Sequence, residues 1–177
     1  MKIIKKSIYL LIMIASVIFS AHAIDIPVRI TGAVYIPPCT VNNGNTIIVS
    51  FDKISVADVD NIINKKTTDI VIDCPYAQGT AYVKVTGAKL NGHENILSVP
   101  GVEGFGISLY QGNDISTPLL IGNGSSNGSE YIGYKITKGL SGSNLFTFTA
   151  LPYSDVSPDK LKTGAFKSTA SMSINYF

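Results

Sequence analysis

The chain has 177 residues and a formal net charge of +2 at pH 7, a length that suits one domain with a real core. Removing residues 1–23 takes away Lys2, Lys5 and Lys6 and leaves 154 of the 177 residues, with 11 positive and 12 negative side chains. The resulting formal net charge of −1 leaves no basic surface of the kind that binds nucleic acid.

The first residues have the pattern of a secretory signal peptide. Lysines precede an apolar run at residues 8–19, which is too short to span a bilayer comfortably, and Ala21-His22-Ala23 forms a small-x-small cleavage site. We therefore expect residues 1–23 to be removed, and a retained membrane anchor is the alternative interpretation. No later stretch is apolar enough for a second span.

Residues 24–34 alternate between apolar and polar side chains, which is the period of a β-strand. Pro27 cannot donate a hydrogen bond to a neighbouring strand, so the segment favours a sheet edge. Gly32 falls on the apolar face. The segment is either a first strand of the chain's own sheet or a detachable strand that completes a neighbouring molecule. Its apolar positions are Ile24, Ile26, Val28, Ile30 and Val34.

Cys39 and Cys74 are the only two cysteines, and both follow the predicted cleavage site. An even number of cysteines in an exported chain predicts one disulfide, which would stabilise the fold by roughly 3–4 kcal/mol. A metal pair or a reactive thiol is disfavoured, because there is no CxxC spacing and His93 is the only histidine after residue 23.

The rest of the chain combines short β-branched and aromatic runs with turn signals, which predicts an all-β sandwich or barrel. Residues 56–66 are the best helical candidate, and they can be as little as one turn within a loop. The expected strands lie at residues 46–51, 68–73, 81–86, 105–110, 131–137 and 145–151. The expected turns are Asn43-Gly44, Asn91-Gly92, Asn123-Gly124, Asn127-Gly128 and Ser141-Gly142.

The C-terminus, from Gly164 onward, has the most regular alternation in the chain. Such alternation predicts a strand with one buried and one wet face, which is found in any ordinary strand of a sandwich. Phe166, Ala170, Met172, Ile174 and Tyr176 share the apolar face, and Lys167, Thr169, Ser171, Ser173 and Asn175 share the polar face.

These two ends, taken with the cysteines, resemble the pilin family of chaperone–usher pili. That family has a glycine fourteen residues from the C-terminus and a penultimate tyrosine, and Gly164 and Tyr176 match. Gly32, Cys39 and Cys74 match the family's N-terminal extension and its paired cysteines. Within the family the chain is most similar to the minor tip subunits of P-type pili, although the terminal Phe177 is a bulky residue at a variable position. The stretches that carry this closer resemblance are residues 34–44, 105–112, 116–119, 122–124 and 168–173.

The resemblance implies an immunoglobulin-like sandwich that lacks its last strand and exposes an apolar groove. It implies a signal peptide at residues 1–23, a donor-strand extension at 24–35 and a pilin domain at 36–177. The implied donor positions are Ile26, Val28, Ile30, Gly32 and Val34. The implied groove residues, which also meet the chaperone strand, are Gly164, Phe166, Ala170, Met172, Ile174, Tyr176 and Phe177. The carboxylate of Phe177 is expected to pair with basic residues of the chaperone cleft.

The implied function is that of a pilus-tip structural subunit that polymerises by donor-strand exchange and links the adhesin to the tip fibre. The implied partners are a periplasmic chaperone, an outer-membrane usher and neighbouring subunits, on a route through the periplasm to the cell-surface fimbrium. In such fibres the extension enters the subunit nearer the tip. A shaft or fibrillum subunit present in many copies is an alternative, and a terminator is disfavoured.

The residues themselves leave two other classes of function as alternatives. A free-standing secreted sandwich that binds a glycan could use tyrosines for stacking, although such residues are more often half-buried in strands. An enzyme would have to use His93, and no GxSxG or HExxH pattern accompanies it. We expect no catalysis, cofactor, metal, nucleic acid or small-molecule substrate. The tyrosines are Tyr35, Tyr76, Tyr82, Tyr110, Tyr131, Tyr134 and Tyr153.

Overall fold

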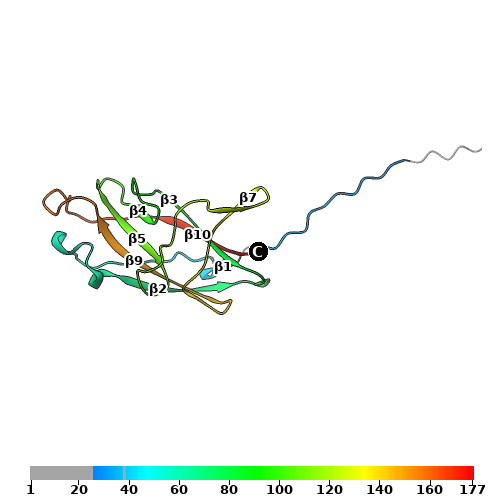
Figure 1. Cartoon of the computed structure of the whole chain (residues 1–177), viewed down its shortest axis with the longest axis horizontal. Coiled ribbons are helices and arrows are strands. Elements are labelled where there is room, and N and C mark those ends of the chain that lie inside the picture. Colours follow the sequence, from blue (N-terminus) through cyan, green and yellow to red (C-terminus); the bar gives the residue numbers. More distant parts are fainter. Residues whose placement is uncertain (1–25, 38) are drawn as a thin grey trace, which may run out of the picture. The chain divides into compact units, whose positions relative to one another are not determined.

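The computed structural model describes residues 26–37 and 39–177. The chain divides into two units, Met1–Val34 and Tyr35–Phe177, and every strand of the described chain lies in the second unit (Figure 1). The predicted signal peptide, residues 1–23, lies outside the described residues. Within the part of the chain that is described, no helix has the length and apolar character needed to cross a membrane.

Tyr35–Phe177 forms two antiparallel sheets, which confirms the all-β prediction. The first sheet has the order β1-β2-β9-β5-β4, with β8 also paired to β9, and the second has the order β10-β3-β7-β6. Figure 1 shows β10, at the red end of the chain, beside the green β3. The first sheet comprises β1 (Thr40–Val41), β2 (Lys66–Asp73), β4 (Ile96–Ser98), β5 (Phe105–Gln111), β8 (Leu140–Ser141) and β9 (Leu145–Ser154). The second comprises β3 (Ala81–Gly87), β6 (Ser125–Asn127), β7 (Glu130–Lys135) and β10 (Ala170–Tyr176).

One hydrophobic core lies between the two sheets, built from the inward side chains of alternating residues. Ile70 on β2 and Phe146 on β9 contribute from the first sheet, and Val83 on β3 and Ile174 on β10 contribute from the second. Each of these side chains is at most 1% exposed. The burial of Ile174 between the sheets therefore follows the apolar period that the sequence of β10 predicts.

The disulfide predicted from the sequence is present and joins Cys39, just before β1, to Cys74, just after β2. The two Cα atoms are 4.3 Å apart, and 35 positions separate the residues in the sequence. The bond ties the residue just before β1 to the end of β2, beside the pairing of these two strands.

The connecting segments follow the predicted turn chemistry. Gly128 has φ = 63° in the hairpin between β6 and β7, a conformation that favours glycine. Residues 56–66 contain only two isolated 3₁₀ turns, η2 (Val56–Asp58) and η3 (Ile62–Asn64), so the helical candidate is no more than turns in a loop. A third 3₁₀ turn, η1 (Asn42–Gly44), has positive φ at all three residues.

Two strand predictions need correction. In residues 46–51 the side chains of Ile47, Val49 and Phe51 are half-buried as the alternation predicts, yet these residues make no backbone hydrogen bonds within the described chain. The C-terminal alternation begins at Gly164, but β10 begins only at Ala170, opposite Gly87 at the end of β3. A strand needs a partner ladder, and neither segment has one beside it.

Candidate strand-binding groove

The edge of β10 that faces away from β3 carries unpaired backbone groups. Phe177 and Thr80 exchange both of their backbone hydrogen bonds, at 3.0 and 2.7 Å. Hydrogen-bonded and non-hydrogen-bonded pairs alternate along an antiparallel ladder. Odd-numbered residues from 171 to 177 therefore direct their backbone groups at β3, and even-numbered residues from 170 to 176 direct theirs outward. The Ile174 carbonyl accepts the Cys39 N–H at 3.0 Å, which agrees with this parity.

Residues 45–54 form a second wall, and from Thr46 onward its backbone also lacks hydrogen-bond partners within the described chain. The segment follows the left-handed η1 turn, which takes the chain away from its pairing with β2. Ile47, Val49 and Phe51 turn their side chains inward, whereas Ile48 is 80% exposed on the opposite face. Asn45 is linked to Asn42 of η1 by two hydrogen bonds, and Asp52 Oδ2 forms an ion pair with Lys66 Nζ at 3.3 Å. The wall therefore has the side-chain arrangement of a strand without a ladder on either edge.

A groove of about 1650 Å³ lies between these two walls. Its lining includes core side chains of both sheets, among them Val85, Ile107 and Phe148. Pockets for small ligands usually enclose about 300–1,000 Å³. A larger groove with an apolar floor and unpaired backbone along both walls suits an extended peptide better than a small molecule.

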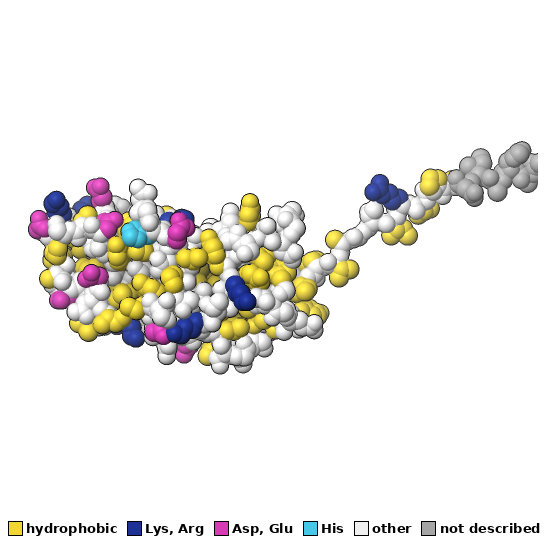
Figure 2. Space-filling view, in the orientation of Figure 1, with side chains coloured by type: hydrophobic (Ala, Val, Ile, Leu, Met, Phe, Trp, Pro, Cys, Tyr) yellow, Lys and Arg dark blue, Asp and Glu magenta, His cyan; other side chains and the backbone are white. Residues whose placement is uncertain are grey.

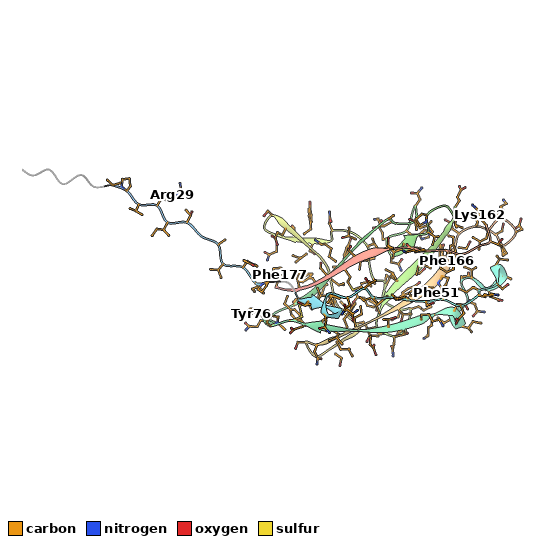
Figure 3. The ribbon with its side chains drawn as sticks, turned by 180° about the vertical axis from the view of Figure 1, so that it is seen from behind. Arg29, Phe51, Tyr76, Lys162, Phe166 and Phe177 are labelled. Atoms are coloured by element: carbon orange, nitrogen blue, oxygen red, sulfur yellow. A yellow bond between two sulfur atoms is a disulfide. The ribbon has the colours of Figure 1, made fainter. Side chains whose placement is uncertain are left out.

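An aromatic cluster occupies one end of the groove. The Phe166 ring centroid lies 4.9 Å from that of the buried Phe105, at an interplanar angle of 80°, and 6.1 Å from that of Phe51. Figure 3 shows Phe51 and Phe166 side by side. At the other end, the Cys39–Ile174 hydrogen bond joins the first residues of the domain to β10. The aromatic cluster and the Cys39–Ile174 hydrogen bond therefore mark the two ends of the groove.

The N-terminal unit contains a segment, residues 26–34, whose apolar side chains are exposed. The side chains of Ile26, Val28, Ile30 and Val34 are between 78% and 104% exposed (Figure 2). No residue from 26 to 37 makes a backbone hydrogen bond within the described chain. Gly32 has no atom within 4 Å of the position that a Cβ would occupy. Exposed apolar side chains in this number are typical of interaction surfaces.

A family model described as "Fimbrial protein" matches residues 28–177. The chain belongs to the fimbrial protein family. It is 42% identical to the Escherichia coli fimbrial adapter PapF over 174 residues, which cover 98% of this chain and 99% of PapF. The minor fimbrial protein PrsF of Escherichia coli is also 42% identical, with the same coverage of both chains.

A solved structure of the P pilus adaptor subunit PapF has the same fold as this fimbrial protein. The TM-score is 0.56 at 38% sequence identity, and the match covers 82% of this chain and 100% of the PapF chain. The resemblance to pilins of P-type tips, first visible in residues 34–44 and in the C-terminal alternation, is thereby confirmed.

The structure places the predicted groove residues of this fimbrial protein in three different settings. Gly164, Phe166, Ala170 and Met172 line the groove. Ile174 and Tyr176 do not line it and are buried in the core, at 0% and 8% exposure. Phe177 pairs with Thr80 at the end of β3.

The sequence reasoning missed the wall at residues 45–54 and the contribution of Phe105. Alternation at residues 46–51 indicates a half-buried strand, but it says nothing about whether a partner lies alongside. The β5 run that begins at Phe105 reads as ordinary core, and only the fold brings its ring against Phe166.

The two ionisable groups with shifted pKa values, Tyr176 and Asp114, do not line the groove. Burial raises the pKa of the Tyr176 phenol above its usual value of 10.0, so its hydroxyl keeps its proton at ordinary pH. The Lys138 ammonium and the Ser116 N–H and hydroxyl lower the pKa of the Asp114 carboxyl, in a loop that does not line the groove. The described residues contain no cluster of three or more His, Cys, Asp or Glu side chains that could hold a metal ion.

Proposed function

We propose that this fimbrial protein is a minor subunit of the pilus tip that works as a two-ended connector. Its groove accepts an extended strand from a partner, and residues 26–34 are the strand that it donates to a neighbour. The observation that carries this proposal is the pair of walls, β10 and residues 45–54, which both present unpaired backbone groups above an apolar floor.

The recognition mode is β-strand addition. Backbone bonds to the outward groups of Ala170 and Met172 supply affinity, and alternate side chains that fill the groove supply specificity. The wall from residue 164 to residue 173 would span about 30 Å if extended, and residues 26–34 would span about 26 Å. A segment of that length from a neighbouring molecule therefore matches the length of this wall.

The apolar donor positions provide a large driving force. Full burial of Ile26, Val28, Ile30 and Val34 contributes roughly 1.5–3 kcal/mol for each side chain. The sum, about 6–12 kcal/mol as an upper bound, is comparable with the whole stability of a small domain, about 5–15 kcal/mol. Release of a strand held in this way is slow, which suits a structural fibre.

The assembly partners that we propose follow from the exposure of the apolar groove. An empty groove is an exposed apolar sheet edge, and such edges aggregate. A periplasmic chaperone fills the groove with its own strand until a neighbouring subunit replaces it at the outer-membrane usher. The donated strand completes the adhesin's pilin domain, and the groove accepts the next tip subunit at the cell surface. This role needs no catalytic group, cofactor or nucleic acid.

The test is expression of the signal-bearing chain in a periplasm with and without a P-type pilus chaperone. The proposal requires soluble protein only as a one-to-one chaperone complex, followed by exchange of the chaperone for an added peptide that spans a neighbour's extension. A stable monomer without the chaperone would mean that the sandwich is self-complete, and would favour a free-standing binding module instead.

A further inference from the structure

The end of the domain that carries the disulfide, which we call the disulfide end, is almost uncharged. Strand pairing brings together there the segments at residues 39–45, 74–80 and 141–144. None of these segments contains an aspartate, glutamate, lysine, arginine or histidine. Asp73 at the end of β2 and Lys135 at the end of β7 are the charged strand residues next to them.

Exposed apolar side chains occupy this uncharged end. Tyr76 is 57% exposed, two residues after Cys74, and Val71 is 49% exposed on β2. Figure 3 shows Tyr76 at one end of the domain, and Lys162 and Phe166 toward the other. Tyrosine is enriched at protein interfaces because its ring is apolar while its hydroxyl can stay wet. Another protein can therefore cover the disulfide end with few ionised side chains to strip of water.

The opposite end of the domain, around the aromatic cluster of the groove, is charged. The segments at residues 52–65, 99–104 and 155–169 meet there, and we call them the groove rim. In the view of Figure 2, acidic and basic side chains gather at this end. Lysines lie among the acidic side chains of the rim, which are Asp52, Asp58, Asp60, Glu103, Asp155 and Asp159. Only Asp52 of this set forms an ion pair within the described chain, so the other carboxylates depend on water.

The Cys39–Ile174 hydrogen bond decides on which side of an acceptor the donor's domain lies. At the disulfide end the Cys39 N–H donates to the Ile174 carbonyl at 3.0 Å, which occupies the edge of β10 there. A strand in the groove stays joined to its own domain, so the link between them must leave at the groove rim. The bound strand then runs antiparallel to β10, which is the more stable pairing. The donor's domain therefore lies against the groove rim of the acceptor.

The donor turns its disulfide end toward that rim. Val34 is the last donated position, and Cys39 follows it by only five residues. A link of five residues spans at most about 18 Å. The ten residues of β9 alone cover about 33 Å of the length of the domain. The far end of the donor therefore cannot reach the acceptor, whereas its disulfide end can.

We infer that the disulfide end is a docking surface for the groove rim of the subunit that receives residues 26–34, and that this partner has an uncharged rim, unlike a second copy of this chain. The inference rests on the proposed function, in which residues 26–34 are donated. If a second copy were the acceptor, the uncharged end would cover its charged rim. Carboxylates and ammonium groups would then lose water without gaining partners. Such a mismatch is one way in which proteins reject a wrong partner, and it favours a single place in the fibre over a run of identical copies.

The first experiment measures transfer of the donated strand to a different subunit. The acceptor is the purified chaperone complex of the adhesin from the same pilus, and wild-type and variant chains compete for it as donors. The ratio incorporated is measured by mass spectrometry. We expect incorporation to fall by about 5- to 50-fold for Tyr76→Asp and for Val71→Asp, because each places a carboxylate in the contact. Tyr76→Phe should be incorporated like wild type.

The matched control for this transfer is Ile63→Asp. Ile63 is 77% exposed on η3, in the rim that the donor does not use when it gives its strand. This variant also places a carboxylate at an exposed apolar position, and it should be incorporated like wild type.

The second experiment measures exchange between identical copies. The chaperone complex of each variant is incubated alone, and homodimers are counted by native mass spectrometry. Glu103→Gln combined with Lys160→Gln removes one charge of each sign from the groove rim. Glu130→Gln combined with Lys84→Gln removes the same two charges from the second sheet. We expect homodimers to form about 3- to 10-fold faster for the rim variant only.

The outcomes separate this inference from the proposed function. Equal incorporation of Tyr76→Asp and Ile63→Asp would overturn the docking surface, and equal self-exchange of the two double variants would overturn the role of the charged rim. In both cases the strand is still transferred, so the proposed function stands. If the wild-type chain transfers no strand to the adhesin complex, the proposed function and this inference fail together.

Discussion

Ala170→Pro is the substitution that most directly probes the backbone of the groove. Ala170 is exposed, begins the edge strand β10 and lies opposite Gly87 in a pair that is not hydrogen-bonded. Its N–H therefore points to the groove and contributes nothing to the chain's own ladder. Proline is tolerated at the first residue of an edge strand, so the free energy of unfolding of the empty subunit should change little.

The expected loss appears only when a strand binds. Removing one N–H···O bond with the bound strand costs about 0.5–1.5 kcal/mol, or about 2- to 12-fold in affinity. Ala170→Val is the matched control, since it keeps the N–H at the same position. Ser171→Pro is the opposite control, because the Ser171 N–H faces Thr86 of β3 and its loss should destabilise the subunit itself.

The assay starts from the purified chaperone complex of each variant and adds a labelled peptide that spans the extension of the neighbouring subunit whose strand the groove accepts. Two variants compete for limiting peptide, and the bound ratio at equilibrium reports the difference in affinity. Equal binding by Ala170→Pro and Ala170→Val would show that the incoming strand does not pair with β10, and the parity argument would then be wrong.

Three further expectations concern other parts of the chain. Cys39→Ser should lower the free energy of unfolding by roughly 3–4 kcal/mol in urea, and an unchanged urea midpoint would show that the bond to Cys74 is not structural. The lowered pKa of Asp114, caused first by its bond to Lys138, adds stability above the unfolded carboxyl pKa, about 3.9, that is lost as the pH falls below it. Asp114→Asn should therefore flatten the acid limb of thermal unfolding, and an identical acid limb in both proteins would contradict this assignment. A Cβ added at Gly32 has no atom within 4 Å in its own chain, so chaperone capture of Gly32→Leu should be normal. Its incorporation into pili, counted by immunogold labelling, should stop, and normal incorporation would exclude Gly32 from the donor face.

The sequence alone determined which side chains of each strand face the core, because an apolar period of two reflects burial of one face. The burial of Ile174 and Tyr176, and the exposure of Ser171 beside them, follow from that period. The joining of Cys39 to Cys74 followed from their number and from the exported character of the chain. These features depend on local pattern and simple counting, which a single sequence displays directly.

Only the tertiary structure decided which backbone edges have partners. Periodicity describes the two faces of a strand, whereas hydrogen-bond partners lie along its edges, in segments far away in the sequence. Residues 46–51 and β10 alternate equally well, yet the first has no ladder and the second has one ladder and one open edge. The contact of Phe166 with Phe105 likewise joins distant segments. The groove exists because of these missing and distant partners, so its walls could be located only once the chain was folded.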